Sequence, residues 1–99
     1  MERTYESTET LYLAFGNKKI RLGDLTFIGR SSDNDIVLED PYVSRKHCMI
    51  EKVLGRYIIA DRGSSNGTFL NGRCVSDDDM VLLGPGDEIR IGNTIFLME

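Results

Sequence analysis

Three short polar segments of the chain carry residue types that bind anions, namely Gly29-Arg30, Ser44-Arg45-Lys46-His47 and Ser64-Ser65-Asn66-Gly67-Thr68. A guanidinium presents a planar fork of donors that matches phosphate oxygens, and a serine hydroxyl can donate to the same oxygens. Arg30 and Ser44 are therefore candidates for contacts to a phosphate. Arg30 also has an ordinary interpretation, as a surface arginine paired with Asp33 or Asp35.

The second segment also permits a catalytic interpretation, because Ser44 lies three residues before His47, the only histidine of the chain. A hydrolase would use Ser44 as nucleophile, His47 as base and an aspartate such as Asp61 to orient the base. No strained nucleophile turn and no oxyanion donors are recognisable around Ser44, so catalysis is not expected and no catalytic residue is assigned. A neutral imidazole that holds a loop through backbone hydrogen bonds is the better interpretation of His47.

The composition favours one small globular domain with a focused binding site. The chain has 99 residues, 40% of them hydrophobic, which suffices for a single packed core. Its formal net charge is −4, whereas affinity for nucleic acid needs clustered lysine and arginine, so no nucleic-acid partner is expected. An anion would have to bind at a local site rather than through the overall field.

Targeting and membrane signals are not recognisable, which favours the cytoplasm, or the nucleus if the source is eukaryotic. Residues 1–10 are polar and acidic, unlike a leader peptide. No apolar run approaches the roughly 20 residues of a membrane span, so no membrane partner is expected. Cys48 and Cys74 are expected to be two buried free thiols rather than a disulfide. One histidine and two distant cysteines do not suggest a zinc site, and neither a metal nor another cofactor is expected.

Turn signals divide most of the chain into short strands. Residues 1–9 lack apolar periodicity and are expected to form a flexible acidic tail, and the folded domain is expected to cover residues 10–99. About eleven strand-like segments follow without a helical apolar stripe of useful length, which predicts an all-β sandwich or barrel. The strongest hairpin signal is Asn71-Gly72 between residues 68–70 and 73–75, because Asn-Gly supplies the positive φ angles of a type I′ turn.

The order of the three polar segments resembles one known family. Gly-Arg, then Ser-x-x-His beginning fourteen residues after the arginine, then Ser-Asn-Gly-Thr and Asn-Gly, is the pattern of forkhead-associated (FHA) domains, and it spans residues 29–72. A loop interpretation explains the serine and asparagine cluster alone, but not this order and spacing. The resemblance implies an eleven-strand β-sandwich of two antiparallel-type sheets, FHA/SMAD-like, that binds phosphothreonine through loops at one end.

The resemblance also implies a role for each matching residue. Arg30 and Ser44 are expected to contact the phosphate, and Ser65 to line the phosphate side of the pocket. Asn66 is expected to hydrogen-bond the main chain of the ligand, and Arg45 to add a basic contact. The residues expected to support the loops are Gly29, His47, Gly67 and Thr68.

The function implied by the resemblance is a phosphothreonine-dependent peptide- or protein-binding module, without catalysis, that acts as a signalling adaptor downstream of Ser/Thr kinases. A phosphate-independent interaction domain that uses another surface is the main alternative. A kinase could also phosphorylate Thr4, Thr8 or Thr10, and the domain could then bind its own tail or a neighbour's. Selectivity beyond the phosphothreonine comes from variable loops in the family, so Asn93 is a candidate only by its position. The chain ends directly after its last expected strand, which suits a fragment or a compact adaptor.

Overall fold

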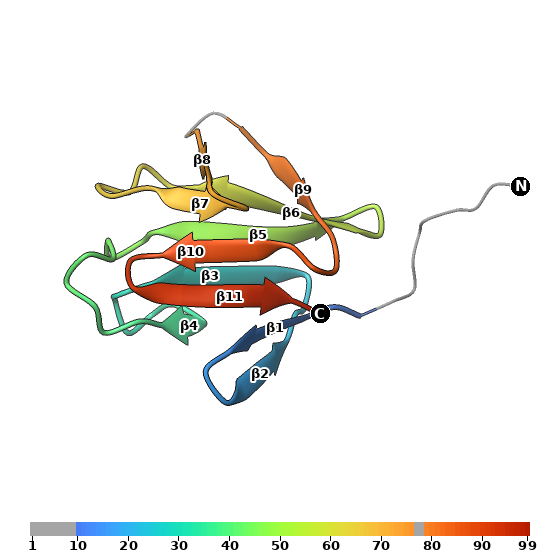
Figure 1. The fold of residues 1–99 in the computed structure, drawn as a ribbon, viewed down its shortest axis with the longest axis horizontal. Helices are drawn as coiled ribbons and strands as arrows, with labels where there is room; N and C mark the ends of the chain where they lie inside the picture. Colours follow the sequence, from blue (N-terminus) through green and yellow to red (C-terminus); the bar gives the residue numbers. More distant parts are fainter. Residues whose placement is uncertain (1–9, 77–78) are drawn as a thin grey trace, which may run out of the picture.

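Two β-sheets make up the fold (Figure 1). The computed structural model describes residues 10–76 and 79–99, and this part of the chain forms β1 (Tyr12–Phe15), β2 (Lys18–Arg21), β3 (Leu25–Gly29), β4 (Ile36–Val37), β5 (Cys48–Val53), β6 (Arg56–Asp61), β7 (Thr68–Leu70), β8 (Arg73–Val75), β9 (Val81–Leu83), β10 (Glu88–Ile91) and β11 (Thr94–Met98). One sheet has the order β2-β1-β11-β10-β7-β8 and the other β4-β3-β5-β6-β9. The predicted all-β, eleven-strand sandwich is confirmed. Within these ranges no helix has the length and apolarity to cross a membrane.

Alternation of side chains explains why these segments form strands. In β10, Ile89 and Ile91 are buried whereas Glu88 and Arg90 are exposed, so the strand has one apolar face. A sheet with one apolar face must bury it against another layer. The two sheets do so in a shared core, whose fully buried large side chains include Leu13, Ile28, Ile50, Ile59, Ile89, Ile91, Phe96 and Met98.

One strand pair departs from the antiparallel pattern. All paired strands run antiparallel except β3 and β4, which are parallel and match Ile28 with Ile36 and Gly29 with Val37. Because β3 and β4 run in the same direction, the chain must leave the sheet after Gly29 and return before β4 begins. Arg30 therefore lies where the polar connection leaves the end of β3.

Four connections share one end of the sandwich, on the left in Figure 1. They are the β3–β4, β4–β5, β6–β7 and β10–β11 connections, and the C-terminal end of β11 lies away from them. All three polar segments identified in the sequence belong to these connections or border them. Loops fixed on a rigid sandwich can place side chains accurately, which makes this end the place to look for a site.

The two cysteines differ in exposure, and neither forms a disulfide. Cys48 in β5 is buried, and its burial raises the pKa of the thiol to about 12. Cys74 in β8 is exposed, so the prediction of two buried thiols is wrong for this residue. The alternation of β8 is the reason, because Val75 is buried and its neighbour Cys74 faces the other side of the sheet.

The predicted turn at Asn71 and Gly72 is confirmed. It joins β7 to β8, which pair as an antiparallel hairpin. The φ angles are 50° at Asn71 and 84° at Gly72, so both residues are left-handed, as a type I′ turn requires.

We expect Gly72→Ala to lower the free energy of unfolding by about 1 kcal/mol, because a Cβ disfavours the left-handed conformation. Gly23→Ala is the matched control, since neither glycine has an atom within 4 Å of an added Cβ and only Gly72 has a positive φ. The control is expected to be neutral or slightly stabilising. Urea unfolding followed by circular dichroism measures both, and equal effects of the two substitutions would contradict this account of the turn.

Candidate functional site

A cavity of about 250 Å³ lies among the β3–β4, β4–β5 and β6–β7 connections at the shared end of the sandwich. Its lining consists of Arg30, Pro41, Tyr42, Val43, Ser44, Arg45, Ser65 and Asn66. The five residues predicted to contact a ligand therefore all line one cavity, although 36 positions separate the first from the last in the sequence (66 − 30). Two guanidinium groups and no carboxylate belong to this lining, so the cavity suits an anion.

Arg30 is oriented by the neighbouring loop. Its Nε donates to the carbonyl oxygen of Val43 at 3.0 Å, which leaves the terminal nitrogens of the fork for a ligand. The alternative interpretation, a surface pair with Asp33 or Asp35, is wrong: the ion pair found among residues 10–76 and 79–99 joins Lys19 to Glu99. The Asp35 carboxylate instead accepts the backbone N–H of Phe27 at 2.8 Å.

Ser44 joins two loops and keeps a donor for a ligand. Its Oγ accepts the backbone N–H of Ser65 at 3.0 Å. A hydroxyl that accepts one bond still has a hydrogen to donate, and Ser44 is only partly buried. Asn66 is exposed, and its Nδ2 donates to the carbonyl oxygen of Tyr42 at 2.9 Å. The amide oxygen of Asn66 thereby faces away from that bond and can accept an N–H.

His47 is fully buried and bonds two different loops. Its Nδ1 accepts the backbone N–H of Ser44 at 3.0 Å, so its Nε2, 2.9 Å from the carbonyl oxygen of Gly67, acts as the donor. These partners define a neutral ring with the proton on Nε2. A base for Ser44 would need a ring nitrogen directed at Oγ, but both nitrogens bond backbone groups. The arrangement expected of a Ser44–His47–Asp61 hydrolase is therefore not assembled.

Asp61 fixes the β6–β7 connection through hydrogen bonds to both of its carboxylate oxygens. Its Oδ1 accepts the hydroxyls of Thr68 and Ser64, each at 2.7 Å, and its Oδ2 accepts the backbone N–H of Ser64 at 2.9 Å. The oxygen of Ser64 in turn accepts the backbone N–H of Gly67 at 3.0 Å. Burial alone would raise the pKa of Asp61, but the hydrogen bonds from Ser64 and Thr68 outweigh it and hold the pKa below its usual value.

Gly29 permits a close approach of the β4–β5 connection. A Cβ at this position would overlap the backbone carbonyl oxygen of Arg45 and would lie 2.8 Å from Nδ2 of Asn34. That same nitrogen donates to the carbonyl oxygens of Arg45 and Ser31, both at 2.8 Å. Gly67 is required for a different reason, since its φ of 90° is left-handed. None of the four residues predicted to support the loops lines the cavity, and each of them contacts a residue of another segment at this end.

Asp40 connects the β10–β11 turn to the β4–β5 connection. Its Oδ1 accepts the backbone N–H of Tyr42 at 2.9 Å, and its Oδ2 accepts that of Asn93 at 2.8 Å. The N–H groups of Asn93 and Tyr42 hold the pKa of Asp40 below its usual value. A Cβ on Gly92 would lie 2.6 Å from Oδ2 of Asp40, and the φ of 58° is left-handed, so this junction favours glycine.

Sequence reasoning missed the positioning roles of Asp40, Asn34 and Gly92, and it considered Asp61 only as part of a hydrolase. A partial signal existed for the two aspartates. Aspartate often bonds the backbone N–H two or three residues later, which matches Asp40 with Tyr42 and Asp61 with Ser64. The bond from Asn93 to Asp40 spans 53 residues and has no local signal.

Asp61 should make stability depend on pH. Its folded pKa lies below the value of about 3.9 in an unfolded chain, so its contribution is complete above that pH and is lost as pH falls through the folded pKa. Asp61→Asn removes both the charged acceptor and its titration. We expect the variant to be less stable than the wild type at about pH 7, and the difference to shrink below about pH 4. Urea unfolding across this range measures the difference, and a constant difference would contradict the assigned role.

Comparison with known proteins agrees with this geometry. A family model described as FHA domain matches residues 26–92. The chain is 42% identical over 67 residues to the glycogen accumulation regulator GarA of Mycolicibacterium smegmatis, and the match covers 68% of this chain and 40% of that protein. The chain spans less than half the length of GarA and of other curated relatives that it matches.

Solved structures show the same fold. EmbR of Mycobacterium tuberculosis, in complex with a low-affinity phosphopeptide, superposes with a TM-score of 0.85 at 35% identity, over 91% of this chain and 24% of that one. An FHA domain described for its phosphothreonine-dependent interactions superposes with a TM-score of 0.83 at 28% identity, over 92% of this chain and 96% of that one. Since the family model matches more than half of the sequence, this chain belongs to the FHA domain family.

Proposed function

We propose that this protein is a phosphothreonine-dependent peptide-binding module that acts as a signalling adaptor downstream of Ser/Thr kinases. The observation that carries the proposal is the cavity at the end of the sandwich, which holds two arginines and two serines and no carboxylate. Phosphothreonine has nearly two negative charges and several strong acceptor oxygens, which such a lining complements. The two similar structures described through a phosphopeptide and through phosphothreonine-dependent interactions support the same ligand class.

We assign the contacts with such a ligand as follows. Arg30 and Ser44 bind the phosphate, because each has donors left after bonding the neighbouring loop. Arg45 and Ser65 add donors from the same lining. Asn66 binds the main chain of the ligand through its amide oxygen, since its amide nitrogen is held by Tyr42. Behind these residues, His47 with Thr68, Gly29 and Gly67 fix the loops that present them.

The expected affinity is modest and depends on the phosphate. Hydrogen bonds to charged groups contribute roughly 1.5–3 kcal/mol each. Two or three of them, together with main-chain contacts, give about −8 kcal/mol, which corresponds to a dissociation constant of about 1 μM. Removal of the phosphate would eliminate most of this energy, so binding is switched by a kinase and needs no catalysis by the domain.

Other functions have less support. The FHA family consists of non-catalytic binding modules, and we extend that property to this chain because the ring of His47 is engaged by backbone groups on both sides. A phosphate-independent role would make no use of the two arginines and two serines that line the first cavity.

Thr4 and Thr8 lie outside the described residues, so capture of a phosphorylated tail stays a prediction. Location in the cytoplasm, or in a eukaryotic nucleus, also stays a prediction and suits a partner of protein kinases.

An oriented phosphothreonine peptide library supplies a binding peptide, and the matched unphosphorylated peptide tests the proposal. We expect the phosphorylated form to bind the wild type at least about 30-fold more tightly, which corresponds to about 2 kcal/mol. Arg30→Ala should remove most of this difference, whereas Arg21→Ala, an exposed arginine of β2, should leave it unchanged. Fluorescence anisotropy measures binding, and urea unfolding verifies that each variant folds. Equal binding of the two peptides, or wild-type affinity in Arg30→Ala, would refute the proposal.

A further inference from the structure

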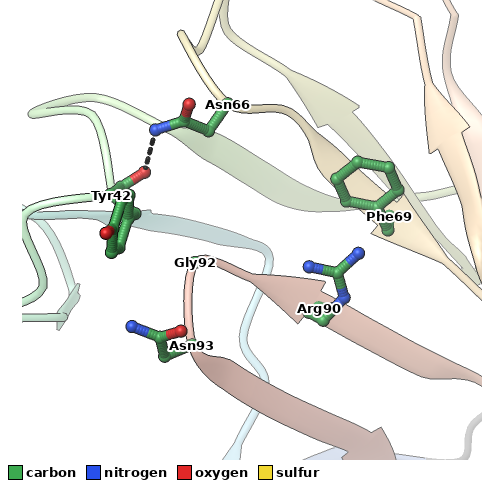
Figure 2. Close-up of a pocket in the computed structure, with 6 residues that line it drawn as sticks. All are labelled: Tyr42, Asn66, Phe69, Arg90, Gly92 and Asn93. Atoms are coloured by element: carbon green, nitrogen blue, oxygen red, sulfur yellow. Dashed lines mark hydrogen bonds between the residues drawn. The ribbon is translucent and has the colours of Figure 1, made fainter.

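A second cavity adjoins the proposed phosphate site. It has a volume of about 370 Å³ and is lined by Tyr42, Asn66, Phe69, Arg90, Gly92 and Asn93 (Figure 2). Tyr42 and Asn66 also line the first cavity. The hydrogen bond between these two residues therefore stands at the boundary of the two cavities, and Figure 2 shows it across from Arg90 and Phe69.

Arg90 gives the second cavity a positive charge. It is the only ionised side chain of the lining, and the other members are neutral. Among residues 10–76 and 79–99, no carboxylate lies within ion-pair distance of Arg90. The cavity therefore suits an anionic group from outside.

The position of Arg90 is defined by a ring rather than by an ion pair. Its guanidinium lies over Phe69, 4.4 Å from the ring centroid, and the two residues face each other across the β10–β7 pair. Stacking of one face leaves the N–H groups at the edge of the plane free to donate. A carboxylate or phosphate approaching along that edge can accept two parallel bonds. The side-chain amide of Asn93 lies in the same lining and can act as an additional donor.

We propose that Arg90 binds a second anionic group of the phosphothreonine ligand, a carboxylate or another phosphate, and so selects acidic ligands. The inference rests on the proposed function, because it places the phosphothreonine in the first cavity. A peptide that crosses the boundary formed by Asn66 and Tyr42 brings a side chain a few residues from the phosphothreonine to Arg90. Residues of an extended peptide are spaced about 3.3 Å apart, so a defined position of the ligand carries the preference.

The test uses phosphothreonine peptides in an alanine-rich background. Each peptide carries one glutamate at a single position, from four residues before to four residues after the phosphothreonine, and has a twin with glutamine at that position. A phosphoserine peptide at the preferred position distinguishes a second phosphate from a carboxylate. Anisotropy measures binding to the full chain and to Arg90→Gln, Arg90→Lys and Arg21→Gln. Arg21→Gln is the control, since Arg21 is also an exposed arginine of the same sheet.

We expect one position at which glutamate binds the wild type about fivefold to tenfold more tightly than glutamine. Arg90→Gln should abolish this preference without weakening the glutamine twin, and Arg21→Gln should retain it. Arg90→Lys should retain part of it, because lysine keeps the charge and loses the planar fork. Urea unfolding establishes that each variant folds.

Two results would overturn the inference while the proposed function stands. One is phosphate-dependent binding without a glutamate preference at any position, and the other is a preference that persists in Arg90→Gln. Failure of the proposed function has a different signature, which is equal binding of phosphorylated and unphosphorylated peptides. Absence of binding by every peptide would overturn both.

Discussion

A fully buried imidazole holds the two sheets together at the binding end of the molecule. His47 directly precedes β5 of one sheet, and its partner Gly67 directly precedes β7 of the other. The second ring nitrogen is occupied by the N–H of Ser44, so one side chain sets the positions of two loops and of a serine that faces the cavity. Water does not reach the buried ring, and loss of either bond would leave a polar group unsatisfied in the interior. The geometry of the cavity depends on this constraint.

Buried carboxylates and an amide extend the same principle around the cavity. Asp61 accepts hydrogen bonds from Ser64 and Thr68, at the two ends of the β6–β7 connection. Asp40 accepts the backbone N–H groups of Tyr42 and Asn93 and so joins the β4–β5 connection to the β10–β11 turn. Asn34 donates to the carbonyl oxygens of Ser31 and Arg45 beside Gly29. All of these bonds are made within the chain, so few groups have to be ordered when a ligand binds. Preorganisation of this kind lowers the entropic cost of association.

Much of the binding cavity could be predicted from sequence, because its residues belong to short motifs with a specific order and spacing. Alternation of apolar residues and the Asn71-Gly72 turn likewise predicted an all-β fold. Contacts between distant segments could not be predicted in this way. Nothing local indicates that Asp40 bonds Asn93, or that Arg90 stacks on Phe69 in a cavity beside the motif residues. The exposure of Cys74 was also missed, since a short edge strand gives little information about which face is buried.

The junction at Gly92 divides the binding end into a part that is constrained and a part that is free to vary. Glycine is strongly favoured at position 92, because its φ of 58° is left-handed and an added Cβ would lie 2.6 Å from Oδ2 of Asp40 and 2.7 Å from Cγ2 of Val43. Arg90 and Asn93, on either side, are exposed and are not subject to that restriction. Substitutions at these two positions can alter what the second cavity recognises without displacing Arg30 or Ser44. Evolution, or a protein engineer, could therefore change ligand preference here while phosphate recognition is inherited intact.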